Sequence, residues 1–514
     1  MTARALVVLG TGSHVGKSVL VTALCRVFSR AGYRVRPFKA QNMALNSFVT
    51  PDGGEVGMAQ AVQAEACGVP PSVEMNPILL KPSSDKECQV VLRGRPIGHI
   101  EARTYWGRKR ELFPAVAEAL ARLRAEADLV VVEGAGSPVE VNLKEWDITN
   151  LRVAELADAP VLLVSDIERG GVFAWLLGTL DLMNPSERSR VRGIIINNFR
   201  GDPDLLKPGL EFLEERAGVP VLGVIPHIPN LRVAQEDSVG LPRNASPGPP
   251  EPGALAIRVV ALPHIANFTD FDPLAQEPGV DLRYVRRPEE LGGADLVIVP
   301  GSKSTVADLE ALRASGVAEA LVRHARAGGR LIGICGGFQM LGEGVEDPDG
   351  VESPCSEAVG LGLLPVQSRF FGEKETHQVE ARGAGVLPGD ERWTLRGYEI
   401  HMGHTRRSPQ CRPAFLIQRR GARAASLEDG AVSADGRIWG TYIHGLFDND
   451  PFRWALLDAL RSERGIPTPA GERIAFERGG AYDRLADRVG ESLDLARIAA
   501  LVGLPLGQQG RPPP

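Results

Sequence analysis

The chain has 514 residues and a formal net charge of -6, with 43% hydrophobic, 24% charged and only 5% aromatic residues. This length exceeds what one hydrophobic core supports, so we expect roughly two to four globular domains with aliphatic cores. The mildly acidic charge gives no electrostatic reason to expect nucleic-acid partners or an anionic membrane. No apolar run approaches the ~20 residues of a bilayer span, so we expect no membrane insertion.

The six cysteines are spread along the chain, and none has CxxC spacing. They therefore suggest neither a disulfide framework nor a zinc site, and a reducing compartment suits them best. We expect a cytoplasmic protein.

The first half of the chain alternates short apolar runs with helical segments. Strands are expected at 5–9, 35–38, 129–132, 161–164, 193–196 and 221–224, and helices at 17–30, 58–66, 108–126, 151–156 and 205–217. Strands that are apolar on both faces, with helices between them, are typical of a parallel sheet covered on both sides. The sequence thus predicts an α/β fold for this half.

A segment rich in proline, LPRNASPGPPEPG at residues 241–253, interrupts the alternation. Its prolines exclude a helix or a central strand, so we predict a linker there. The expected domains are 1–240 before it and 254–450 after it, followed by a C-terminal helix and tail at 451–514. In the second domain, strands are expected at 256–261, 296–299 and 331–334, followed by β-rich segments to Tyr442.

The sequence GTGSHVGKS at residues 10–18 lies between the first expected strand and the first expected helix. Backbone N–H groups at such a turn cradle phosphate groups, helped by the helix dipole. Lys17 would reach the terminal phosphates, and the Ser18 hydroxyl would bind Mg²⁺. Thr11 stands where the strict motif has glycine, and a chance glycine turn is the alternative. We predict an ATP site formed by Gly10, Thr11, Gly12, Gly16, Lys17 and Ser18.

This loop resembles that of dethiobiotin synthetase and its relatives, which activate carboxylates with ATP. The resemblance implies a P-loop domain of that type, with a second Mg²⁺ ligand at the end of a buried strand. Glu133, which closes the apolar run 129–133, is the candidate, because a carboxylate buried there is costly unless it binds a cation. A strand-end glutamate that faces water is the alternative.

Further polar residues follow other expected strands of the first half. In an open parallel sheet, ligands bind beyond the carboxyl ends of the strands. Asp166 would contact substrate or metal, Arg169 would hold an anion, and Asn197 would read an adenine edge, although an ordinary turn explains Asn197 almost as well. Gln41 and Asn42 are neutral donors suited to a polar substrate, and structural capping is the alternative.

Cys335 lies in the segment RLIGICGGFQM, which predicts a strand, a sharp turn with glycines on both sides, and a helix. Such a turn presents a nucleophile, and the helix N-terminus supplies backbone N–H donors for an oxyanion. The N–H of Gly336 is the first candidate donor. His444 directly follows an apolar strand and is the candidate base. The second oxyanion donor is expected at Gly301 or Ser302.

These residues together resemble the class I glutamine amidotransferases, which hydrolyse glutamine at a Cys–His pair. Most members have a glutamate two residues after the histidine, but here that position is Leu446. This departure matches the cobyric/cobyrinic branch of the family. The segments that carry the closer likeness, to the cobyric acid synthases over roughly residues 1–460, are 10–18, 40–43, 165–171, 300–304, 397–405 and 440–445.

The resemblance implies ATP- and glutamine-dependent amidation of the b, d, e and g carboxylates of adenosylcobyrinic acid a,c-diamide through an acyl phosphate, with ATP and Mg²⁺ as cofactors. Because Leu446 cannot orient His444, we expect Glu399 or a backbone carbonyl to do so. The alternatives are a cobyrinic acid a,c-diamide synthase and a nucleotide-switched binding protein with an inactive glutaminase-like domain. The sequence does not indicate an oligomeric state.

Overall fold

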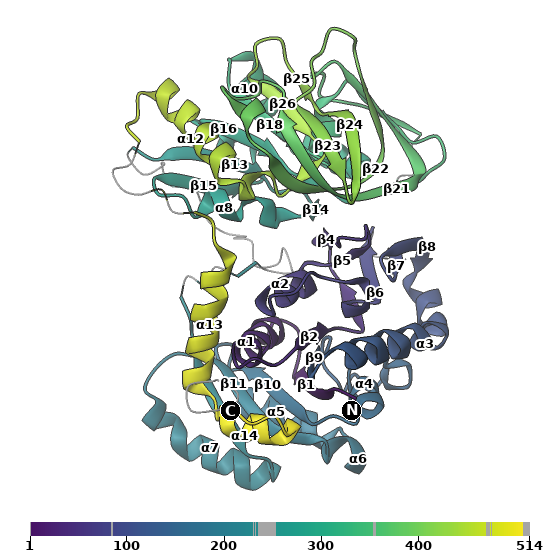
Figure 1. Cartoon of the computed structure of the whole chain (residues 1–514), viewed down its shortest axis with the longest axis vertical. Coiled ribbons are helices and arrows are strands. Elements are labelled where there is room, and N and C mark those ends of the chain that lie inside the picture. The colour runs from purple at the N-terminus through teal and green to yellow at the C-terminus, as the bar shows by residue number, and fades with distance from the viewer. Residues whose placement is uncertain are drawn as a thin grey trace.

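The computed structural model describes residues 2–83, 86–229, 231, 233–234, 253–352, 356–468, 473 and 475–506. The expected linker at 241–253 lies outside them, apart from Gly253. Two α/β halves lie one above the other in Figure 1, with the N-terminal half below. The predicted fold class is confirmed, because each half is built around a largely parallel sheet.

The sheet of the N-terminal half has six parallel strands in the order β12-β11-β10-β1-β9-β2. Alternate residues of β1 face two different hydrophobic cores, because successive side chains of a strand point to opposite faces. The strands are β1 (Arg4–Gly10), β2 (Val35–Phe38), β9 (Leu129–Glu133), β10 (Val161–Asp166), β11 (Val191–Phe199) and β12 (Val221–Pro226).

Helices from both ends of the chain cover this sheet. One core joins the sheet to α3, α4, α5 and α7, and the other joins it to α1, α13 and α14. The helices are α1 (Lys17–Arg30), α2 (Met58–Ala66), α3 (Ala102–Glu126), α4 (Leu151–Ala157), α5 (Val172–Asp181), α6 (Pro185–Arg188), α7 (Pro203–Ala217), α13 (Arg478–Ser492) and α14 (Leu495–Val502). The last two helices therefore belong to the packing of the first half, as the yellow helices in Figure 1 show.

A group of short strands between β2 and α3 was not expected from the sequence. They form a four-stranded sheet, β3-β6-β7-β8, and a separate hairpin, β4-β5. This group lies on the side of the N-terminal half that faces the C-terminal half (Figure 1). Its strands are β3 (Gln41–Met43), β4 (Ser47–Val49), β5 (Glu55–Gly57), β6 (Ile78–Pro82), β7 (Glu87–Leu92) and β8 (Arg95–Glu101).

The C-terminal half contains a sheet in the order β15-β13-β16-β18-β26-β25, parallel except for its last pair. Its strands are β13 (Leu255–Val260), β15 (Val280–Val285), β16 (Leu296–Val299), β18 (Arg330–Ile334), β25 (Ala431–Val432) and β26 (Ile438–Thr441). The helices of this half are α8 (Asp272–Ala275), α9 (Thr305–Ala314), α10 (Val317–Arg326), α11 (Gly336–Leu341) and α12 (Asp450–Arg464).

A second sheet of this half is built around the long hairpin of β21 and β22. Its strands are β19 (Gly344–Glu346), β20 (Glu357–Val359), β21 (Val366–Gly383), β22 (Leu395–Arg407), β23 (Phe415–Arg420), β24 (Arg423–Asp429) and β27 (Ile443–His444). Two very short strands, β14 (Ile265–Ala266) and β17 (Gly301–Ser302), pair with each other. The hairpin brings segments of the C-terminal half against the β4-β5 hairpin of the N-terminal half.

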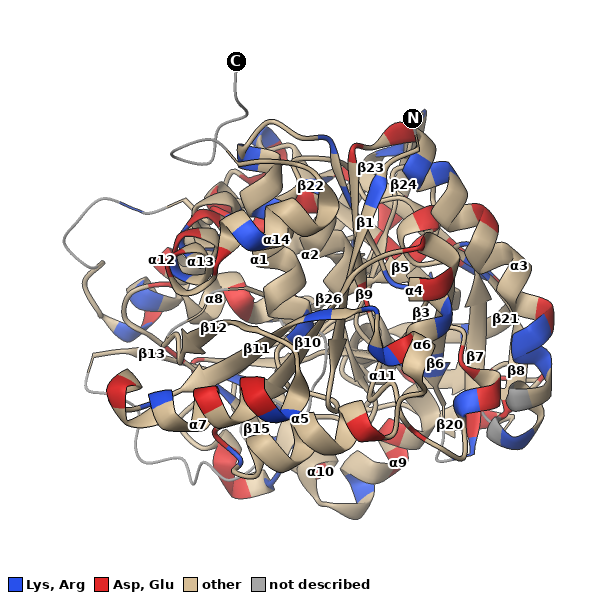
Figure 2. Ribbon diagram, turned by 90° about the horizontal axis from the view of Figure 1, so that it is seen from below, with Lys and Arg blue, Asp and Glu red and all other residues tan. Residues whose placement is uncertain are grey.

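Lys and Arg alternate with Asp and Glu on the helices seen from below (Figure 2). Among the described residues, no helix is both long enough and apolar enough to cross a bilayer. The domain boundaries given above stay a prediction.

Two candidate active sites

The first candidate site is the loop between β1 and α1. Lys17 is buried, and its Nζ donates to the backbone oxygens of Gly12, at 2.6 Å, and Gly136, at 3.2 Å. Gly16 has a φ of 99°, and a Cβ there would lie 2.0 Å from Nδ2 of Asn197. A glycine is therefore needed at this position for both conformational and steric reasons.

Glu133 lies at the end of β9, directly beside this loop, and is 1% exposed. Its Oε1 accepts hydrogen bonds from Oγ of Ser18 and Nζ of Lys39, both at 2.9 Å, and its Oε2 accepts from Nε2 of Gln63 at 2.5 Å. Burial on its own raises the pKa of Glu133, but Lys39 and these hydrogen bonds outweigh it, and the pKa lies below its usual value.

The adjoining oxygens of Ser18 and Glu133 fit Mg²⁺, a cation that takes oxygen ligands and completes its shell with phosphate oxygens and water. No cluster of three or more potential metal-ligating side chains occurs within the described ranges. The candidate protein ligands of Mg²⁺ at the phosphate loop are therefore these two, Ser18 and Glu133. Nζ of Lys39 donates to the same Oε1 of Glu133, so the Lys39 side chain would have to move when Mg²⁺ binds.

The other residues predicted for this site lie around the same edge of the sheet. Asn197 rests against the loop and donates from Nδ2 to the backbone oxygen of Val15 at 3.1 Å, so its role toward adenine stays a prediction. Asp166 accepts from the backbone N–H of Glu168 at 2.7 Å and from Nδ2 of Asn198 at 2.9 Å. These bonds brace the turn after β10.

Arg169 is exposed and lines a cavity of about 560 Å³ together with loop residues Thr11 and Gly12. An anion held there would lie beside the phosphate loop. Gln41 accepts from the hydroxyl of Tyr105 at 2.5 Å, and Asn42 donates to Oε1 of Gln60 at 3.0 Å. Both amides are thus partly used in structural hydrogen bonds.

Of these residues, Asn42, Lys17, Ser18, Glu133 and Asn197 line a second, neighbouring cavity of about 590 Å³. The loop therefore borders two open spaces, each large enough for a small-molecule ligand.

The second candidate site is the turn between β18 and α11. Cys335 has a φ of 52° and a ψ of -111°, a backbone conformation that is strained for any residue other than glycine. A Cβ on Gly337 would lie 2.0 Å from the backbone oxygen of Val299, and one on Gly333 would lie 2.8 Å from that of Gly337. Glycines on both sides of the cysteine are needed because the backbone segments approach so closely.

His444 ends β27 and faces Cys335 across Gly301. A Cβ on Gly301 would lie 3.2 Å from Cε1 of His444 and 3.8 Å from Cβ of Cys335, so all three residues are close neighbours. A Cβ on Gly336 would lie 2.9 Å from the backbone nitrogen of Ser302. The structure thus brings together the residues that the sequence suggested as nucleophile, base and oxyanion donors, while the oxyanion role of Gly301, Ser302 and Gly336 stays a prediction.

Asp270, which sequence reasoning missed, orients His444. It lies in a 3-10 turn at Phe268–Phe271, and its Oδ2 is 2.7 Å from Nδ1 of His444. Its Oδ1 also accepts from the backbone N–H of Gly445 at 3.0 Å. Burial on its own lowers the pKa of His444, but Asp270 and Cys335 outweigh it and raise this pKa to about 10. The His444 ring is therefore held as an imidazolium beside the Cys335 sulfur.

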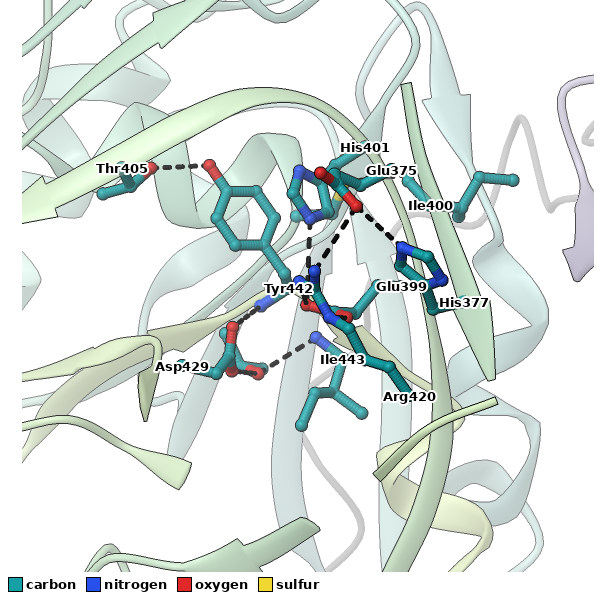
Figure 3. Close-up of polar contacts among 12 residues, drawn as sticks. Glu375, His377, Glu399, Ile400, His401, Thr405, Arg420, Asp429, Tyr442 and Ile443 are labelled. Atoms are coloured by element: carbon teal, nitrogen blue, oxygen red, sulfur yellow. Dashed lines mark hydrogen bonds and ion pairs between the residues drawn. The ribbon is translucent and has the colours of Figure 1, made fainter. Parts of the chain in front are cut away.

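The expectation that Glu399 orients His444 is wrong. Glu399 is paired with Arg420, whose Nε and Nη2 donate to its two oxygens at 2.7 and 3.0 Å (Figure 3). Nε2 of His401 lies 3.9 Å from Oε1 of Glu399, and the His401 ring stacks on Tyr442. Glu399 therefore belongs to a buried network behind the site.

The two halves meet beside the cysteine site. Asn46 accepts from the backbone N–H of Phe268 at 3.0 Å, and Asn267 accepts from that of Ser47 at 3.2 Å. These two bonds tie the start of β4 to the turn that carries Asp270. The group that orients His444 is thus itself held by the N-terminal half.

Comparisons with known proteins agree with this arrangement. A family model described as a CobB/CobQ-like glutamine amidotransferase domain matches residues 256–452, and one described as an AAA domain matches residues 4–235. The fold and these matches define a glutamine-dependent ligase that forms amide bonds.

Three curated relatives are named cobyric acid synthase. That of Sorangium cellulosum is 54% identical, over 98% of this chain and 99% of its own length. That of Moorella thermoacetica is 52% identical, over 98% of each chain. That of Syntrophobacter fumaroxidans is 50% identical, over 98% of this chain and 99% of its own. The chain belongs to the cobyric acid synthase family.

Proposed function

We propose that this chain amidates the b, d, e and g side-chain carboxylates of adenosylcobyrinic acid a,c-diamide, a step of cobalamin biosynthesis, using ATP and glutamine. The observation that carries the proposal is the presence, in a chain of this family, of a Cys335–His444–Asp270 arrangement together with the loop of Lys17, Ser18 and Glu133. The first supplies ammonia, and the second activates the carboxylate that ammonia attacks.

In the activating half-reaction, a corrinoid carboxylate oxygen attacks the γ-phosphorus of ATP, and ADP leaves. Lys17 and the backbone N–H groups of the loop hold the phosphates and offset the charge that develops on them. Ser18 and Glu133 would hold Mg²⁺, which supplies further positive charge to the phosphates when bound. Arg169, beside the loop, would hold another carboxylate of the polyanionic substrate.

In the glutamine half-reaction, Cys335 has passed its thiol proton to His444, and the resulting thiolate attacks the side-chain carboxamide carbon of glutamine. The imidazolium of His444 gives its proton to the leaving nitrogen, and ammonia departs. His444 then removes a proton from the water that hydrolyses the thioester to glutamate. Asp270 keeps the His444 ring oriented through both steps. Ammonia displaces phosphate from the acyl phosphate, which forms the amide.

The test measures synthesis by one variant of each site, first with glutamine and then with free ammonia as the nitrogen donor. Cys335→Ala should lose glutamine-dependent synthesis by more than roughly 10³-fold, yet retain synthesis from free ammonia. Lys17→Ala should lose synthesis from both donors. Mass spectrometry of the product should show four successive replacements of a hydroxyl by an amino group.

Other outcomes would redirect the proposal. A product with fewer amides, formed from the unamidated acid, would favour an a,c-diamide synthase. Failure of the unmodified chain to hydrolyse glutamine, with ATP turnover that needs no acceptor, would favour a nucleotide-switched binding protein.

A further inference from the structure

The space beside Cys335 is walled by charged side chains that the chemistry above does not use. It encloses about 40 Å³, and its charged lining, apart from His444, consists of Lys81, Lys303, Glu352 and Lys374. Lys81 comes from β6 of the N-terminal half, and the others come from the C-terminal half. Charged side chains so close to the nucleophile are candidates for binding a charged substrate.

Two of the three lysines are satisfied by one buried carboxylate. Glu55 accepts from Nζ of Lys81 at 2.7 Å and from Nζ of Lys374 at 2.5 Å. Lys81 also donates to Oγ of Ser47 at 2.9 Å. These two ammonium groups therefore have partners within the chain, and they link the two halves.

Lys303 has no such partner. Its side chain is only 7% exposed, and among the described residues its Nζ has neither a hydrogen bond nor an ion pair. Burial lowers its pKa, although Glu352 and Cys335 act in the opposite direction. A buried ammonium without a partner costs several kcal/mol, so its presence at a cavity points to an anionic ligand.

Glu352 is the complementary group on the same wall. One of its oxygens accepts a long bond, 3.2 Å, from the backbone N–H of Thr305. Burial raises its pKa, and the attraction of Lys303 and the hydrogen bonds from Thr305 offset this only in part. A cationic group on the ligand would stabilise the charged carboxylate further.

We propose that Lys303 binds the α-carboxylate of glutamine and that Glu352 binds its α-ammonium group. Glutamine carries both charges on one carbon, and its carboxamide lies at the other end of a short chain, where Cys335 would attack it. Lys303 directly follows Gly301 and Ser302, which flank Cys335, so a ligand that reaches the sulfur passes Lys303. This inference rests on the proposed function and assigns residues to substrate recognition in it.

The N-terminal half completes this binding site. The cavity is too small for glutamine, so its walls must move apart when glutamine enters. Lys81 and Lys374, tied together through Glu55, form the wall at the border between the halves. Glutamine entry is therefore coupled to the contact between the two halves.

The test uses two analogues of glutamine with the full-length chain. 4-Aminobutanamide lacks the α-carboxylate, and glutaramate lacks the α-amino group. For the unmodified chain, each deletion should lower kcat/KM for hydrolysis roughly 10- to 100-fold, the effect of one lost hydrogen bond between charged groups.

Lys303→Met should raise KM for glutamine by a similar factor and leave kcat within about threefold. It should also abolish the preference for glutamine over 4-aminobutanamide, while preserving the preference over glutaramate. Glu352→Gln should abolish the preference for glutamine over glutaramate and preserve the preference over 4-aminobutanamide. Lys207→Met, which removes an exposed lysine of α7, is the matched control and should change neither preference.

Unchanged preferences in both variants would overturn the inference, as would a fall in kcat without a rise in KM. If Lys303→Met does not fold, Lys303→Arg tests the same point, because it keeps the charge and should retain the preference for an α-carboxylate. Failure of the unmodified chain to hydrolyse glutamine would instead count against the proposed function.

Discussion

The phosphate-loop site borders cavities of about 590 and 560 Å³, whereas the cysteine site encloses only about 40 Å³. The first presents backbone groups and a few charged side chains at the open edge of a sheet. The second is lined by buried, charged side chains from both halves. An open site suits a large macrocycle that must present several carboxylates, and a closed site suits a small amino acid whose nitrogen must not be lost to water.

The difference also concerns how each site depends on the rest of the chain. The loop of Lys17 and Ser18 is positioned within one half, by its own strand and helix. Cys335 and His444 lie in the C-terminal half, but Asp270 is held through Asn46 and Asn267, and the cavity wall includes Lys81. Changes at the border between the halves should therefore affect glutamine hydrolysis more than phosphate binding.

The largest effect expected at this border is that of Asp270→Asn. Without the carboxylate, only Cys335 opposes the lowering of the His444 pKa by burial, so the ring is held less firmly as an imidazolium and loses its orienting partner. We expect kcat for glutamine hydrolysis to fall roughly 10²- to 10³-fold.

The pH profile supplies a second readout for this variant. In the unmodified chain, the raised pKa of His444 keeps the imidazolium up to about pH 10, so activity should decline only as the pH rises through that value. In Asp270→Asn the decline should begin at a lower pH. Glu399→Gln, which alters another buried carboxylate of the same half, should lower kcat less than about tenfold. Equal losses in both variants would contradict the role of Asp270.

A smaller effect, on stability, is expected for Glu55→Gln. This change leaves Lys81 and Lys374 buried without their shared anion, which costs about 3 kcal/mol. Amide hydrogen exchange in β4 and β5 should accelerate roughly 100-fold. Glu155→Gln, at an exposed pair with Arg152, should leave exchange unchanged.

The ion pairs of Glu55 with Lys81 and Lys374 predict that stability depends on pH. Burial on its own raises the pKa of Glu55, but Lys374 and Lys81 outweigh it and hold this pKa far below its usual range. A carboxyl with a lowered pKa stabilises the folded chain above its ordinary pKa, and this contribution is lost as the pH falls. Exchange in β5 should therefore quicken in acid for the unmodified chain, and less so for Glu55→Gln.

The smallest effect is expected where the last helices meet α1. Nε and Nη2 of Arg26 donate to the two oxygens of Asp483 at 2.8 and 3.0 Å, but the Asp483 side chain is 41% exposed. Asp483→Asn should cost about 0.5–1 kcal/mol, seen as slightly faster exchange in α13. Asp487→Asn, at the more exposed pair with Arg30, should cost less. A large loss of stability in either variant would mean that the packing of α13 depends on these ion pairs more than on its apolar face.

Much of the fold and of both sites was predictable from the sequence. The core strands and helices have regular apolar patterns, and several observed bounds, such as Lys17–Arg30, equal the expected ones. Cys335, His444 and the phosphate loop each lie in a strand–turn–helix or strand-end pattern. These patterns are local, so one sequence suffices to find them.

The residues that were missed act over long distances in the chain. Asp270 lies 174 positions before its partner His444, in a short turn without a motif. Glu55, Lys81 and Lys374 look like ordinary surface charges in the sequence, because the ion pairs that join them link both halves of the chain. Strands β3 to β8 are short and partly polar, so their periodicity is weak.

The packing of α13 and α14 on the first sheet has a consequence for how the chain comes apart. An isolated antiparallel β-bridge joins Gly223 of β12 to Leu493, and the helices share the core of α1. A protease that cut the backbone once between residues 234 and 253 would yield a second fragment still anchored to the first by its own tail. Nicked protein should therefore migrate as a single species until denatured, and only a second cleavage, before α13, would remove that anchor.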